Sequence, residues 1–250
     1  MHLKILSYNI HKGFSVTNRK FVLQNIKKAI KLTDADLVLL QEVIGQHDIH
    51  SKKIDHWPTC TQLEFLADET WPHYAYGKNA VYEAGHHGNA ILSKYPILEW
   101  KNINISSNKF EERGLLQTLI QLPNLSIPLL CICVHLSLFR NGQHWQINQI
   151  RSAVKAHAHG KGPVIVAGDF NDWRCIASSI FEKDLLEVFQ ELHGQHARTF
   201  PALAPLLRLD RIYYRDILAL NASVLSGDPW RSLSDHAPIC AELKINEELI

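Results

Sequence analysis

The sequence predicts an α/β fold in a single domain. Apolar, β-branched runs alternate with amphipathic segments, which is the pattern of strand and helix units. Four of the apolar runs stop abruptly on polar residues, and ligands collect at the carboxyl ends of strands in α/β proteins. No Pro-, Gly- or Ser-rich linker and no charge block divides the 250 residues, so we expect one domain over residues 1–250.

The first half of the chain predicts a strand, a helix and a second strand, which together make a βαβ unit. The helix is amphipathic, because Phe21, Ile26 and Ile30 recur at helical spacing while lysines occupy the other positions. The expected elements are a strand at 3–8, a helix at 19–33, a strand at 37–40, a short helix at 64–69, a loop at 77–88 and a strand at 89–93.

The second half predicts a hairpin around Pro123-Asn124, two helices and three further strands. The first helix ends where Gly160-Lys161-Gly162-Pro163 breaks the periodic pattern. The expected elements are strands at 115–122 and 127–134, a helix at 146–157, a strand at 164–168, a helix within 176–193 and strands at 211–214 and 237–243.

The polar residues at strand edges point to one shared site. Four apolar runs end on Asn9, on Gln41-Glu42, on His135 and on Asp169 followed by Asn171. Strands hold such groups rigidly while exposing them. With later residues near strand edges, the set is Asn9, Glu42, His135, Asp169, Asn171, Asp210, Asp235 and His236.

This set contains no thiolate, which distinguishes it from a structural zinc site. Carboxylates and amides suit a hard cation such as Mg²⁺ or Mn²⁺. A hard cation together with two histidines and an acid that manages a water is the equipment for hydrolysing a phosphate ester, because charge on the phosphate oxygens must be neutralised.

Composition narrows the classes of protein. Lysine plus arginine total 26 against 25 acids, a formal charge of +1, so no long-range field favours polyanions. This disfavours a non-specific nucleic-acid binder and leaves a local basic patch open. The five cysteines have no metal-ligand spacing, and Cys131 and Cys133 share one strand face, which favours core packing.

The chain begins with a strand, without a charged leader or an apolar signal segment. No apolar run approaches the length that spans a bilayer. We therefore expect a cytoplasmic protein with reduced thiols, without a transmembrane segment and without an obligate protein partner.

Seven motifs follow one another in an order that resembles the endonuclease/exonuclease/phosphatase superfamily. Almost end to end, the chain resembles the compact bacterial YbhP-like subgroup. Each motif alone recurs by chance, whereas the ordered combination is specific. The motifs are Ser7-Tyr8-Asn9-Ile10-His11, Leu40-Gln41-Glu42-Val43, the stretch 88–97, Val134-His135-Leu136, Gly168-Asp169-Phe170-Asn171, Leu209-Asp210-Arg211-Ile212-Tyr213 and Ser234-Asp235-His236-Ala237-Pro238.

The resemblance implies a DNase I-like fold, a four-layer α/β sandwich of two mixed β-sheets face to face with helices outside. It also implies a Mg²⁺-dependent phosphoesterase, with Mn²⁺ as a substitute, that acts most often on a phosphodiester by in-line attack of water. Glu42 would be the principal Mg²⁺ ligand, assisted by Asn9 and Asp235.

The resemblance implies catalytic roles for five further residues. Asp169 would orient or deprotonate the attacking water, and Asn171 would hold that water or a phosphate oxygen. His135 and His236 would donate to the scissile phosphate, and Asp210 would fix the tautomer of His236. Whether Asp169 or His236 takes the proton stays open.

Several assignments have a structural alternative. Asn9 and Asn171 could satisfy backbone groups at turns, and Asp210 could pair only with Arg211. Arg113 lies in a motif that recurs in related family members, where it would clamp a substrate phosphate. Its alternative is an ion pair with Glu111 or Glu112.

Two features concern the surroundings of the site. Some nucleases of the superfamily carry a glutamate that supports the first histidine, whereas this chain has His86, His87 and Asn89 there. The two histidines belong either to the pocket rim or to an ordinary loop. Three tryptophans near the expected site loops either stack on a base or sugar or pack in the core or rim: Trp145, Trp173 and Trp230.

The sequence leaves the substrate open among a nucleic acid, a phospholipid headgroup and a small phosphodiester. The apolar stretch 200–207 beside Asp210 is either a lipid-facing lip or packing beneath the site. A different class of function is a non-catalytic protein that binds a phosphate ligand and keeps the fold. Such a protein would be expected to lose metal or proton-handling residues, and all eight are present.

Overall fold

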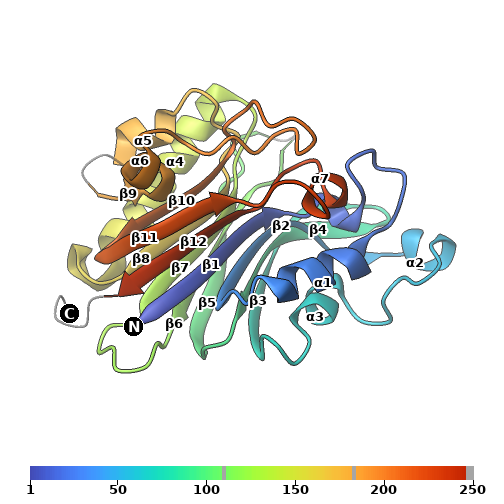
Figure 1. The fold of residues 1–250 in the computed structure, drawn as a ribbon, viewed down its shortest axis with the longest axis horizontal. Coiled ribbons are helices and arrows are strands. Elements are labelled where there is room, and N and C mark those ends of the chain that lie inside the picture. Colours follow the sequence, from blue (N-terminus) through green and yellow to red (C-terminus); the bar gives the residue numbers. More distant parts are fainter. Residues whose placement is uncertain (109–110, 182–183, 246–250) are drawn as a thin grey trace.

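Two six-stranded β-sheets pack face to face in the computed structural model, which describes residues 1–108, 111–181 and 184–245 (Figure 1). The strand order is β11-β12-β1-β2-β4-β3 in the first sheet and β5-β6-β7-β8-β10-β9 in the second. The strands are β1 (His2–Asn9), β2 (Leu37–His47), β3 (His73–Tyr82), β4 (Gly85–Ser93), β5 (Ile97–Asn104), β6 (Gly114–Ile120), β7 (Leu129–His135), β8 (Val164–Asp169), β9 (Leu186–Glu187), β10 (Asp210–Arg215), β11 (Ile217–Val224) and β12 (Ile239–Ile245).

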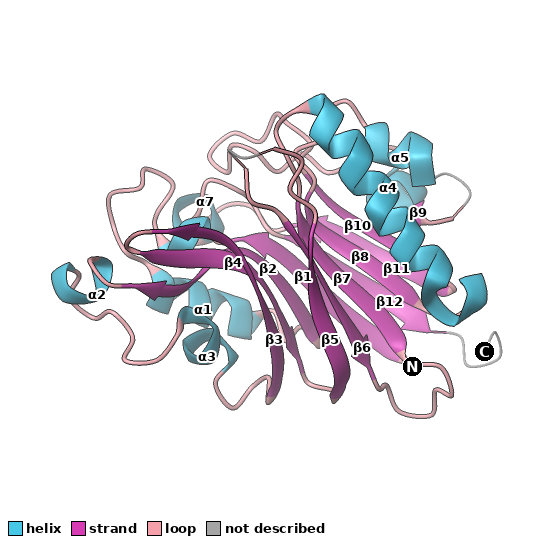
Figure 2. Cartoon of the chain, turned by 180° about the vertical axis from the view of Figure 1, so that it is seen from behind, coloured by secondary structure: helices cyan, strands magenta, loops and turns pink. Residues whose placement is uncertain are grey.

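Helices cover the outer face of each sheet (Figure 2). Apolar residues of α1, α3 and α7 pack on the first sheet, and those of α4 and α5 pack on the second. The helices are α1 (Leu23–Leu32), α2 (His50–Lys53), α3 (Gln62–Ala67), α4 (Arg140–Ala156), α5 (Ile176–Phe181), α6 (Val188–His193) and α7 (Trp230–Leu233). Among the described residues, no helix is both long and apolar enough to cross a membrane.

Both sheets are mixed. β1 runs parallel to β2 and β7 runs parallel to β8, whereas the other paired strands are antiparallel. The four-layer, DNase I-like α/β sandwich that the resemblance implies is therefore confirmed.

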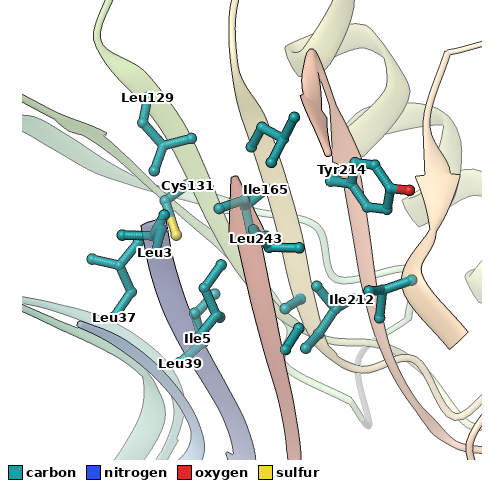
Figure 3. Close-up of a cluster of buried hydrophobic side chains, with 14 of the residues drawn as sticks. Leu3, Ile5, Leu37, Leu39, Leu129, Cys131, Ile165, Ile212, Tyr214 and Leu243 are labelled. Atoms are coloured by element: carbon teal, nitrogen blue, oxygen red, sulfur yellow. The ribbon is translucent and has the colours of Figure 1, made fainter. Parts of the chain in front are cut away.

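Strands buried on both faces explain the continuous apolar runs in the sequence. In β1, Leu3 and Ile5 lie between the sheets, while Leu6 and Tyr8 face the outer helices. Figure 3 shows the inter-sheet cluster, in which Leu39 of β2 lies near Ile5. Cys131 is buried in the same cluster together with Cys133, as the shared strand face predicts.

Truncating the inter-sheet core should be costly. Leu39 is fully buried, so Leu39→Ala should lower the free energy of unfolding by about 2–5 kcal/mol, through lost transfer free energy and the cavity left behind. Leu218→Ala, on the exposed face of β11, should change it by less than about 0.5 kcal/mol. Urea denaturation measures both values, and equal losses in the two variants would contradict the inter-sheet position of Leu39.

The prediction of a loop at residues 77–88 is wrong, because β3 and β4 form an antiparallel hairpin there. Glycines prompted the loop assignment, but one of them serves close packing of the strands. A Cβ atom at Gly88 would lie 1.8 Å from the carbonyl oxygen of Gly77. Glycine in a strand interior can mark such an approach instead of a turn.

The helix expected within 176–193 is interrupted. It ends at Phe181, and Leu186 and Glu187 then pair with Tyr214 and Tyr213 as β9 before α6 begins. Pairing with an existing sheet edge outweighs the local helical pattern there. Strands β5 and β11 were not expected from the sequence, and each presents many exposed residues instead of a continuous apolar run.

Candidate active site

The second sheet brings three of the predicted site residues together as cross-strand neighbours. His135 at the end of β7 lies opposite Asp169 at the end of β8, and Asp169 lies opposite Asp210 at the start of β10. Because β10 is antiparallel to β8, its first residue lies at the same edge as the last residue of β8. Gly168 permits the close strand contact, since a Cβ atom there would lie 2.0 Å from the Val134 carbonyl oxygen.

The first sheet contributes Asn9 and Glu42. Asn9 at the end of β1 pairs with Gln41 of β2, so Glu42 is the next residue along. The strand does not stop at Glu42, as the sequence pattern indicated, but continues to His47. Between Leu40 and Val43 two residues of β2 face a single residue of β4, which is a β-bulge, and Glu42 has a positive φ of 57°. A bulge of this kind re-aims a side chain.

Hydrogen bonds join the two sheets at this edge. Asn9 Nδ2 donates to Asp169 Oδ2 at 3.1 Å, across the interface between the sheets. Ser234 Oγ donates to the Asn9 carbonyl oxygen at 2.7 Å. The second bond holds the loop that carries Asp235 and His236 against the end of β1. Residues far apart in the sequence therefore meet at one place.

A buried acid–imidazole network forms the centre of the site. His236 Nδ1 lies 2.9 Å from Asp210 Oδ2, and His236 Nε2 lies 3.6 Å from Asp169 Oδ2. Burial lowers the pKa of His236, but the charges of Asp210 and Asp169 outweigh burial and raise it above the usual range. Burial and the charge of Asp210 raise the pKa of Asp169. Asp210 and Asp169 therefore favour the protonated form of His236, and Asp210 contacts its Nδ1 atom.

The second histidine of the site has the opposite character. His135 Nε2 also lies 3.6 Å from Asp169 Oδ2. Burial and the positive charge of Arg113 lower the pKa of His135 well below its usual value, so its ring is neutral at pH 7. Among the described residues, no side chain or backbone group forms a hydrogen bond with the His135 ring. No such residue therefore takes the place of the glutamate that supports the corresponding histidine in some nucleases.

Glu42 lies at the outer, partly exposed end of the site. Its Oε2 atom is 3.4 Å from Lys12 Nζ, yet it has no hydrogen-bond partner among the described residues. Burial raises the pKa of Glu42, but the nearby imidazole of His135 and ammonium of Lys12 outweigh burial and lower it to about 2. Glu42 is therefore a carboxylate at neutral pH.

The residues at this outer end fit a hard divalent cation. Glu42 and Asp235 are carboxylates, and Asn9 Oδ1 accepts one hydrogen bond, from the His11 amide at 3.1 Å, and keeps a second lone pair. Mg²⁺ prefers such oxygen donors. The buried Oε2 atom of Glu42, which has no hydrogen-bond partner among the described residues, could serve as one of these donors.

A second group has metal-like spacing in the described part of the chain. Ligand atoms of Asp169, Asp210 and His236 lie within 4.8 Å of one another, all of them buried. This spacing could hold a metal ion. The Nδ1 atom of His236 in this group is already engaged with Asp210.

Asn171 is fixed by its neighbours. Its backbone amide donates to Asp169 Oδ1 at 3.0 Å, and its Nδ2 donates to the Leu136 carbonyl oxygen at 3.0 Å. Gln143 of α4 donates to the Asn171 carbonyl oxygen at 2.7 Å. The side chain of Asn171 therefore satisfies a backbone group, as the structural alternative predicts. Its second amide hydrogen is still available for a ligand.

Arg113 directly precedes β6 and lies beside Glu111. Arg113 Nη2 is 3.6 Å from Glu111 Oε1, and Arg113 Nε has no hydrogen-bond partner among the described residues. Glu111 in turn accepts hydrogen bonds from Ser137 Oγ and from the Leu138 amide. The pairing weighed as an alternative is present, and it holds the guanidinium near His135.

The alternative pairing of Asp210 with Arg211 is wrong. Arg211 is fully buried, and its Nη1 donates to the backbone carbonyl oxygen of Asp210 rather than to the carboxylate. Its Nη2 donates to the Asp172 carbonyl oxygen. Arg211 therefore braces the backbone beneath the site.

Sequence reasoning missed three residues that border the site. Lys12 faces Glu42, His11 Nδ1 lies 3.9 Å from Asp235 Oδ1, and Gln143 supports Asn171. Of these, Lys12 could have been found from its position directly after the Asn9 motif. His87 lies in β4 and not in a loop, so the rim reading of that residue is the better one.

The three tryptophans differ in their environment. Trp230 packs edge-on against Tyr8 with ring centroids 5.6 Å apart, as the packing alternative predicts. Trp145 and Trp173 are exposed. Trp173 lines a small pocket of about 140 Å³ with Phe139, next to Asn171.

Comparison of sequences gives a consistent family match. A family model described as the endonuclease/exonuclease/phosphatase family matches residues 6–236. The chain is 44% identical over 244 residues to the uncharacterised protein YbhP of Escherichia coli K12, which covers 97% of this chain and 96% of that protein.

Comparison of structures gives the same fold. An endonuclease/exonuclease/phosphatase structure from Beutenbergia cavernae has a TM-score of 0.77 and 18% identity, covering 98% of this chain and 72% of that one. A humanised D. rerio TDP2 has a TM-score of 0.72 and 21% identity, covering 97% of this chain and 99% of that one.

Proposed function

Because the chain belongs to the endonuclease/exonuclease/phosphatase family, we propose that it is a Mg²⁺-dependent phosphodiesterase that cleaves a P–O bond by in-line attack of water. The observation that carries this proposal is the buried His236–Asp210 pair beside Asp169, next to the oxygen donors Asn9 and Glu42. A proton-handling group thus lies next to oxygen donors that suit a cation, a combination that can hydrolyse a phosphate ester.

Glu42 would hold the cation, with Asn9 and Asp235. When bound, Mg²⁺ would neutralise charge on the phosphate oxygens. Mn²⁺, which takes the same kind of oxygen ligands, would substitute for it.

The remaining residues act on water and phosphate. Asp169 orients the attacking water and accepts its proton, because its carboxylate lies between the two imidazoles, with Oδ2 3.6 Å from each. His236, held protonated by Asp210, donates from Nε2 to the phosphate as negative charge grows there. The neutral His135 donates a second hydrogen bond.

Two further groups position the substrate. Asn171 offers its remaining amide hydrogen to the water or to a phosphate oxygen. Arg113 supplies a cation that its ion pair with Glu111 holds near His135. The substrate is a phosphate ester in a nucleic acid, a phospholipid headgroup or a small phosphodiester.

Metal removal tests the proposal. Purified protein should hydrolyse bis(p-nitrophenyl) phosphate with added Mg²⁺ or Mn²⁺, and exhaustive chelation should lower the rate by about 100-fold or more. Returning Mg²⁺ should restore the activity, while Ca²⁺ serves as a comparison cation with looser geometry.

Two results would contradict the proposal. Full turnover after chelation would exclude the cation. Confirmed Mg²⁺ binding without hydrolysis of abasic DNA, plain DNA, RNA, phospholipids or phosphorylated metabolites would favour the non-catalytic phosphate-binding protein.

A further inference from the structure

An apolar loop leans over the catalytic histidine. Residues 200–207, which we call the lip, fold back on themselves: the Leu207 amide donates to the Phe200 carbonyl oxygen at 2.8 Å. The lip is tied to the site, because the Ala202 amide donates to the Asp235 carbonyl oxygen at 2.7 Å. The Phe200 ring lies 5.0 Å from the His236 ring.

The tip of the lip points away from the protein core. Leu203 is 62% exposed and Leu206 is 68% exposed, and no charged residue occurs between Phe200 and Leu207. The sequence allowed this stretch to be packing beneath the site, and the exposure of these two leucines excludes that alternative for the tip. Exposed apolar groups gathered in this way mark an interaction surface.

A second apolar segment borders the same network. Leu138 and Phe139 follow His135, and Trp173 follows Asn171; all three are exposed and line one small pocket. We call these three residues the rim. Asn171 bonds to Asp169, which contacts His236 beneath the lip, so the lip and the rim both border the acid–imidazole network, and we call the surface that they share the active-site mouth.

Each apolar segment is flanked by arginine. Arg140 follows Phe139, Arg174 follows Trp173, and the lip lies between Arg198 and Arg208. None of these four arginines forms an ion pair with another described residue, so their charge is available to a partner, although the whole chain carries a net charge of only +1. Arginines beside exposed apolar side chains suit a surface that combines anionic headgroups with a hydrocarbon interior.

We propose that the lip and the rim seat the active-site mouth on an anionic phospholipid bilayer, so that the phosphodiester it cleaves is one presented at a membrane surface. The leucines and Phe139 would enter the acyl boundary, and the arginines would contact lipid phosphates. The membrane contact stands on the exposed surface alone, whereas the substrate class rests on the proposed function.

A nucleic acid accounts for these observations less well. Aromatic rings such as Trp173 can stack on bases, but aliphatic tips such as Leu203 and Leu206 have no π-face for a base. A strand of nucleic acid also requires a continuous basic groove, whereas here Arg140, Arg174 and Arg208 each stand next to an exposed apolar residue.

Vesicle sedimentation tests the membrane contact without reference to catalysis. The wild-type chain should bind vesicles of phosphatidylcholine with about a third phosphatidylglycerol more tightly than pure phosphatidylcholine vesicles. The double variant Leu203→Asp/Leu206→Asp should bind the anionic vesicles about tenfold more weakly. Leu218→Asp changes another exposed leucine, on β11, and should bind as the wild type does.

The outcomes separate this inference from the proposed phosphodiesterase. Glu42→Gln should bind vesicles as the wild type does, because binding does not depend on turnover. Unaltered binding by the lip variant at an unaltered melting temperature would overturn the inference, as would the absence of wild-type binding to anionic vesicles. Binding of single-stranded DNA that falls in Arg140→Ala/Arg174→Ala, without vesicle binding, would assign the surface to a nucleic acid instead.

Discussion

Replacing Glu42 by glutamine should reduce turnover of bis(p-nitrophenyl) phosphate by more than about 100-fold and weaken Mg²⁺ binding. Glutamine keeps the size of the side chain and removes its charge. The Oε2 atom of Glu42 has no hydrogen-bond partner among the described residues and lies 3.4 Å from Lys12 Nζ, so a bound cation would share this carboxylate with Lys12. Steady-state kinetics and calorimetric titration with Mg²⁺ measure the two effects separately.

A matched control is Glu99→Gln, on the exposed part of β5. It should leave turnover and Mg²⁺ binding unchanged. If Glu42→Gln retained wild-type Mg²⁺ affinity while turnover fell, Glu42 would act on the substrate and not on the cation. Retained turnover would remove Glu42 from the site altogether.

Replacing His236 by alanine should lower kcat by about a thousandfold with a small change in KM. The imidazolium is most useful when charge accumulates on the phosphate, so its loss affects the transition state more than substrate binding. His2→Ala, at an exposed position of β1, should have no effect.

Asp210 should act through His236, and the corresponding variant separates this positioning role from a merely structural one. Asp210→Asn should lower kcat by about 10–100-fold with KM nearly unchanged. It should add little to His236→Ala in the double variant, because both changes remove the same donor. Independent, multiplicative losses would show that Asp210 does not work through the histidine.

The apolar runs predicted most of what positions the site. Strand ends at Asn9, His135 and Asp169 could be identified because a buried strand is continuously apolar and its end is abrupt. The strand topology then explains why they meet: β1 runs parallel to β2, and β7 runs parallel to β8. The packing of the two sheets was predicted from the order of the motifs, through the family resemblance. The periodicity of single segments carries no information about that packing.

The parts that could not be predicted depend on contacts between distant segments. Lys12 faces Glu42 only because the turn after β1 folds over β2. The sequence predicts a loop in place of the β3–β4 hairpin because Gly77 and Gly88 locally favour turns. Their close approach across the two strands depends on strand pairing, which the local sequence does not show. Likewise, β9 exists only because β10 offers an edge to pair with.

The bulge at Glu42 sets folding against chemistry at a single residue. A glutamate with positive φ costs on the order of 1 kcal/mol, which glycine or asparagine would largely avoid. A laboratory selection for heat resistance alone would therefore favour those residues at position 42. The variants obtained in such a selection would be more stable but would lack the carboxylate on which the proposed reaction depends.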